Sequence, residues 1–62
     1  MNEAQSIQEA FEARIQLIFG SFLQSYNDAQ GDTAKEKKAE DVFRNGITFS
    51  RRVRDRALAL LP

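Results

Sequence analysis

The sequence contains no cysteine, no histidine and no tryptophan, and its single proline is the last residue, Pro62. Without cysteine the chain forms no disulfide, and without cysteine and histidine it lacks the ligands of the common structural zinc sites. The same absences remove the most frequent general base and the usual nucleophile–base pairs. We therefore expect a protein that is not an enzyme and that uses no metal and no cofactor.

Long apolar runs are missing too. No uninterrupted apolar stretch approaches the about 20 residues that span a bilayer. The first residues also lack the basic and apolar regions of a signal peptide. These features predict a soluble, cytoplasmic protein that does not engage a membrane.

Small size sets the next limit. A chain of 62 residues makes one domain at most and buries little of its surface as a monomer. Chains of this size usually rely on disulfides, a metal or a partner subunit. With no cysteine or histidine present, we expect close helix packing combined with self-association.

Apolar residues recur with a helical period along two stretches, about 3–29 and about 34–61. In the first stretch they form one stripe, with Phe19 and Leu23 widening one side of it. In the second stretch they cover roughly half of the helix circumference. One neighbouring helix cannot cover so wide a face, so the second stretch favours assembly of more than one chain.

Capping residues mark the ends of these helices. Asn2 and Ser6 compete as the first cap, each with Gln or Glu three residues later. Gly31 suits the left-handed position after a helix end. Thr33 with Glu36 forms a further capping box that restarts the helix. The short connection makes the two helices antiparallel neighbours.

The sequence thus predicts an all-α fold in which residues 1–62 form a single domain. That domain is a two-helix antiparallel hairpin with a turn at about 30–33, and two hairpins self-associate into a four-helix bundle. A homodimer is the simplest assembly, and a higher oligomer stays open. The length and layout are similar to those of small plasmid- and phage-type hairpin dimers. The candidate oligomer interface comprises Phe11, Ile15, Ile18, Phe22, Phe43, Ile47, Phe49, Val53 and Leu60.

Charge is distributed unevenly although the net charge is zero. Residues 1–32 carry five acidic and one basic side chain, a net charge of −4, and residues 33–62 carry four acidic and eight basic ones, a net charge of +4. Four arginines fall within residues 51–56. The candidate residues for binding a partner or an anion are Arg44, Arg51, Arg52, Arg54 and Arg56.

Three interpretations of this arginine cluster stay open. In an antiparallel hairpin, residues 51–56 lie beside the acidic start of the chain, so the arginines can pair with Glu3, Glu9 and Glu12. They can instead form a surface for a protein partner. Finally, they can bind the phosphates of RNA, DNA or a small nucleotide.

Three further residues depart from the simple pattern. Leu17 lies nearly opposite the apolar stripe of the first helix, either as an ordinary exposed leucine or as a contact with another protein. Arg14 and Arg54 lie at the edges of their apolar stripes. Each either extends along apolar neighbours or lines a cleft for an anionic group.

We expect a non-catalytic interaction or regulatory module, which binds or inhibits another protein through an exposed helix face of a homo-oligomeric hairpin. The alternative is an anion-binding module whose arginines bind RNA, DNA or a nucleotide near the subunit interface. A purely structural oligomerisation unit is a third reading.

Overall fold

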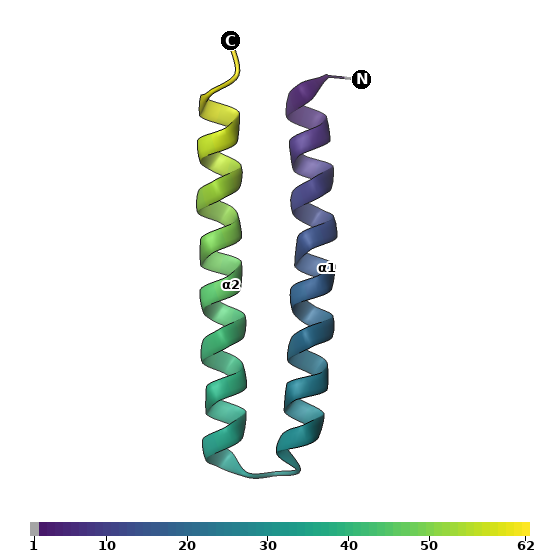
Figure 1. Cartoon of the computed structure of the whole chain (residues 1–62), viewed down its shortest axis with the longest axis vertical. Coiled ribbons are helices and arrows are strands. Elements are labelled where there is room, and N and C mark those ends of the chain that lie inside the picture. The colour runs from purple at the N-terminus through teal and green to yellow at the C-terminus, as the bar shows by residue number, and fades with distance from the viewer. Residues whose placement is uncertain (1) are drawn as a thin grey trace.

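The computed structural model describes residues 2–62, and Met1 lies outside the described residues. Two helices, α1 (Glu3–Ala29) and α2 (Thr33–Ala59), pack side by side and antiparallel, so residues 2–4 and 61–62 lie at the same end of the molecule (Figure 1). The predicted all-α hairpin is confirmed.

Helix α1 begins after Asn2, whose side-chain oxygen accepts a hydrogen bond of 2.7 Å from the Gln5 backbone N–H. The earlier of the two competing caps therefore starts the helix. At the other end Gln30 (φ 49°) and Gly31 (φ 82°) both adopt left-handed backbone conformations. Gly31 takes the conformation that its lack of a Cβ favours.

Helix α2 differs from the prediction at both ends. Asp32, not Thr33, is its cap, because the Asp32 carboxylate accepts hydrogen bonds of 3.0 and 3.2 Å from the backbone N–H groups of Ala34 and Lys35. The helix ends at Ala59 rather than at residue 61. Pro62 disfavours the helical conformation at Leu61, the residue that precedes it, and Leu60 forms the cap.

The hairpin is a single layer of helices. Its Cα atoms extend over 48 × 18 × 6 Å, and Ala29 and Ala39 are the only buried residues among residues 2–62. The helices meet along a half-buried seam in which the rings of Phe22 and Phe43 lie 4.8 Å apart. Ile18 packs against Gly46, where an added Cβ would lie 3.5 Å from the nearest Ile18 atom. A seam this narrow leaves both sides of the layer open to solvent.

Candidate interaction surfaces

Large apolar side chains stay exposed on both sides of the hairpin. The most exposed are Leu60 (67%), Leu17 (65%), Val42 (63%), Phe49 (61%), Leu23 (59%), Phe19 (53%) and Val53 (50%). At about 100° per residue, Leu17 and Phe19 lie about 160° apart around α1. The exposed apolar residues therefore divide into two surfaces, one on each side of the seam.

The first surface, here called the arginine face, is built mainly by α2. It consists of Arg14 and Leu17 of α1 and of Val42, Phe49, Arg52, Val53, Arg54, Arg56 and Leu60 of α2. These residues line three adjoining hollows along the hairpin. Because the hollows share Arg14, Val53 and Ala57, they form one continuous groove.

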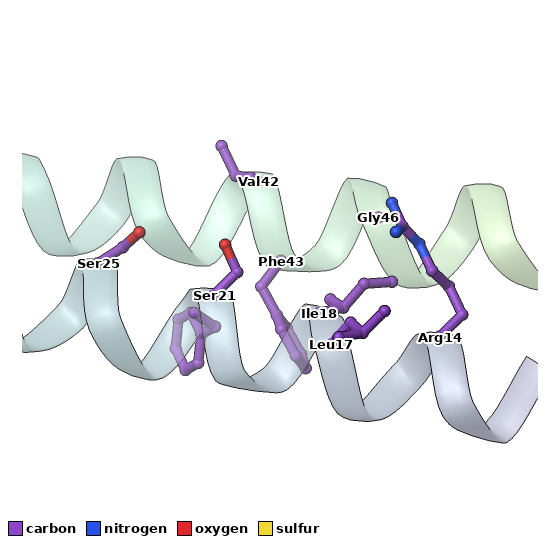
Figure 2. Close-up of a pocket in the computed structure, with 9 residues that line it drawn as sticks. Arg14, Leu17, Ile18, Ser21, Ser25, Val42, Phe43 and Gly46 are labelled. Carbon is purple, nitrogen blue, oxygen red and sulfur yellow. The ribbon is translucent and has the colours of Figure 1, made fainter.

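Arg14 lies in the middle of this groove. It lines two of the three hollows, which have volumes of about 260 and 310 Å³. Figure 2 shows its side chain reaching from α1 towards Gly46 of α2, past Ile18 and Leu17. Within residues 2–62 no carboxylate forms an ion pair with Arg14. Its guanidinium therefore offers unpaired donors at the centre of an apolar groove.

Arg54 is held differently. Its side chain is 24% exposed, its guanidinium stacks on the Phe11 ring of α1 at 4.3 Å, and its Nε donates to Asp55 at 2.9 Å. A guanidinium over an aromatic face combines apolar packing with electrostatic attraction to the ring. Arg54 thus joins the two helices while keeping charge at the groove.

Arg52 and Arg56 border the outer end of the groove. Together with Val53 and Leu60 they line its third hollow, and the Arg52 guanidinium lies 6.0 Å from the centre of the Phe49 ring. Neither arginine forms an ion pair with any described residue. No carboxylate lines any of the three hollows of the arginine face.

The second surface, here called the tyrosine face, carries charges of both signs. It consists of Phe19, Leu23 and Tyr26 of α1 and of a hollow lined by Phe22, Glu40, Phe43, Arg44, Ile47, Thr48 and Arg51. The Tyr26 ring packs on Phe22 at 5.5 Å. The carboxylate of Glu36 on α2 raises the pKa of the Tyr26 phenol above its ordinary value, with smaller contributions from desolvation and Glu40.

The five candidate arginines do not form one cluster. Arg44 and Arg51 line the hollow of the tyrosine face, Arg52 and Arg56 line the outer hollow of the arginine face, and Arg54 lies at the seam. Residues close in sequence separate because each step along a helix turns the side chain by about 100°. A single phosphate site within one hairpin would need side chains that converge, and these diverge.

Pairing of the arginines with the acidic start of the chain is not observed. Each ion pair among residues 2–62 lies within α2, joining Lys37 to Asp41, Arg44 to Asp41 and Arg54 to Asp55. Glu9 and Glu12 instead accept hydrogen bonds from Gln5 and Gln8 on their own helix. The two helices are held by apolar and aromatic contacts, and the charges stay at their edges.

The candidate oligomer interface also divides. Six of its residues are half-buried: Phe11, Ile15, Ile18, Phe22, Phe43 and Ile47. Phe49, Val53 and Leu60 are exposed on the arginine face. Val42, which belongs to the wide apolar stripe of the second helix, and Leu23, at the edge of the first stripe, are both well exposed. The angular position of Leu23, at the rim of the stripe, is the signal that marks it in the sequence.

Comparison with known proteins adds no assignment: no protein-family model, no curated protein and no solved structure matches the chain. Over residues 2–62, neither helix combines the length and the apolar character needed to cross a membrane. The same residues bring together no group of three acidic side chains that could hold a metal ion. Any function must therefore be argued from the two faces.

Proposed function

We propose that the chain is a non-catalytic protein-interaction module. In this proposal the hairpin pairs with a second copy through its tyrosine face and binds a different protein through its arginine face. The observation that carries the proposal is the exposure of large apolar side chains on both sides of a single helical layer. Burial of such side chains is the main favourable term in protein association.

The surface area supports association of this kind. The hairpin exposes 5003 Å², whereas a compact monomer of 7.1 kDa exposes about 4,100 Å². The excess, about 900 Å², is close to the about 800 Å² that each partner buries in a standard interface. The radius of gyration, 14.6 Å, likewise exceeds the about 11 Å of a compact chain of this length.

Charge indicates which face suits a second copy. Two arginine faces brought together would oppose arginines without a carboxylate between them, which is unfavourable. The tyrosine face carries Glu40 beside Arg44 and Arg51, so a second copy supplies both signs of charge. Pairing through the tyrosine face would give a four-helix bundle that leaves the arginine face open.

Binding of RNA, DNA or a nucleotide has less support. The candidate arginines point to three sides of α2, and the most charged groove is lined largely by apolar side chains. Phosphate binding draws on converging positive charge and shows a steep dependence on salt. Nucleic acid is therefore kept as one of the outcomes of the test below.

Capture from the host cell tests the proposal. A tagged wild-type chain is compared with Phe49→Asp, which places a charge on the arginine face, and with Gln16→Glu, a control that adds the same charge at an exposed polar position of α1 that lines none of the hollows. We expect wild type and Gln16→Glu to retain the same protein and Phe49→Asp to lose it, as read by mass spectrometry. Equal retention by all three chains, or retention of nucleic acid in place of protein, would contradict the proposal.

A further inference from the structure

We infer that the arginine face receives an acidic amphipathic helix of another protein. This inference rests on the proposed function and deepens it by naming the chemistry of the partner. Three features of the arginine face support it: the spacing of the exposed apolar residues, the unpaired arginines among them and the concave shape of the groove.

The spacing suits a helix. Val42, Phe49, Val53 and Leu60 follow one another at intervals of seven, four and seven residues, and all are exposed. Such intervals place side chains in a straight line along α2, as in the seam of a coiled coil. Leu60 lies eighteen residues after Val42, which at a rise of 1.5 Å per residue gives a line about 27 Å long, or about five helical turns.

Small residues deepen the groove beside this line. Gly46, Ser50 and Ala57 lie between the large side chains and line the hollows with them. Side chains of an added helix can enter such hollows as knobs enter holes. A flat bilayer surface has no side chains to fill hollows of about 260 and 310 Å³, so the shape favours a helix over a membrane.

The arginines define the charge of that helix. A helix laid over the groove covers Arg14, which lies at its centre and forms no ion pair with any residue from 2 to 62. Removing the Arg14 charge from water costs free energy if no partner group replaces the water. A carboxylate opposite the guanidinium offsets this cost, because it accepts two parallel hydrogen bonds. Arg52 and Arg56 extend the positive charge towards the open end. The partner helix therefore carries one apolar stripe flanked by Asp or Glu.

A second copy of this chain does not meet that requirement through the same face, because the three hollows contain arginines and no carboxylate. A nucleic acid would supply negative charge but no apolar stripe for Val42, Phe49 and Val53. An acidic amphipathic helix supplies both.

Two synthetic helices of about 21 residues provide the test. Both carry Leu at the first and fourth heptad positions, and the flanking positions are Glu in one and Lys in the other. Binding of each labelled helix to the wild-type chain is followed by fluorescence anisotropy at low and high salt. We expect the Glu helix to bind at least about tenfold more tightly at low salt, and the difference to shrink as salt screens the charges.

Variants locate the site. Arg14→Gln is expected to weaken binding of the Glu helix by about tenfold and not to weaken binding of the Lys helix, because it removes a charge of the same sign as lysine. Lys37→Gln removes one positive charge from an exposed position outside the hollows, and we expect it to change binding less than twofold. Circular dichroism checks that both variants keep the helical content of the wild type.

Equal affinity for the two helices, tighter binding of the Lys helix, or an unchanged preference in Arg14→Gln would overturn the inference. In each of these cases the proposed function survives if capture from the host still depends on Phe49. Failure of both helices to bind, together with host capture that is insensitive to Phe49→Asp, would overturn the proposed function as well.

Discussion

Tyr26 shows how a single side chain reports on the packing of the hairpin. It is the only tyrosine, and no tryptophan is present, so its phenol can be followed without overlap from other residues. The Glu36 carboxylate across the seam disfavours the phenolate and raises the Tyr26 pKa. Separation of the helices would remove this effect.

We therefore predict that Tyr26 titrates at higher pH in the folded chain than in the chain unfolded by urea. A raised pKa in the folded state means that the folded chain holds the phenolic proton more tightly. The resulting stabilisation is complete below the unfolded pKa of about 10 and is lost as the pH rises through the folded value. Ultraviolet absorbance of tyrosinate measures both midpoints, and Glu36→Gln should bring the folded midpoint closer to the unfolded one. A folded midpoint at or below the unfolded one would contradict the assignment.

At the scale of the helices, Gly20 and Gly31 differ in whether a larger side chain can replace the glycine. Gly20 lies within α1 with no heavy atom within 4 Å of the position of an added Cβ. Gly31 lies in the turn with φ at 82°, a conformation in which a side chain is strained. Close packing therefore does not explain the glycine at position 20.

Gly20→Ala is expected to raise the free energy of unfolding by about 1 kcal/mol, because alanine favours the helix and meets no obstacle. Gly31→Ala is expected to lower it by about 1–2 kcal/mol, because the left-handed conformation is retained at a cost. Urea unfolding followed by circular dichroism gives both values. A loss of stability in Gly20→Ala would show that the position contacts something outside the hairpin.

The helix boundaries could be predicted in part from the capping and turn residues in the sequence. Asn2 and Gly31 act as their types suggest, one as a cap and the other in a left-handed turn. Asp32 precedes Thr33, and either residue can cap α2, so the choice depended on the local geometry that the turn imposes. Pro62 indicates a helix end nearby, because it disfavours the helical conformation at Leu61, but α2 ends two residues before Leu61, at Ala59.

At the scale of the whole molecule, the two faces lead to a prediction about assembly. We expect wild type to give a mass of about twice 7.1 kDa by light scattering at micromolar concentration. Leu23→Glu should reduce this to the mass of one chain, because it places a charge in the tyrosine face. Leu17→Glu makes the same change on the arginine face and should leave the dimer intact. A wild-type mass of 7.1 kDa, or dissociation by Leu17→Glu alone, would refute pairing through the tyrosine face.

The hairpin itself is predictable because apolar period, capping residues and a short turn all indicate the same fold. The two candidate surfaces are harder to predict from the sequence than the hairpin. Arg51 and Arg52 are neighbours in sequence, yet they line hollows on different sides of α2. Likewise Val42 belongs to the apolar stripe, but the neighbouring helix is too narrow to cover it. Which part of a wide stripe stays exposed depends on the rotation of each helix about its axis, and periodicity alone does not fix that rotation.

The antiparallel layout has a practical consequence for engineering. Asn2, Glu3 and Ala4 line one small hollow together with Leu61 and Pro62, at the end of the hairpin opposite the turn (Figure 1). A polypeptide that enters at Asn2 leaves beside the same point, so the hairpin can be inserted into a surface loop of a carrier protein with short linkers. It would then project from the carrier as an arm, with the turn at its tip and both faces accessible.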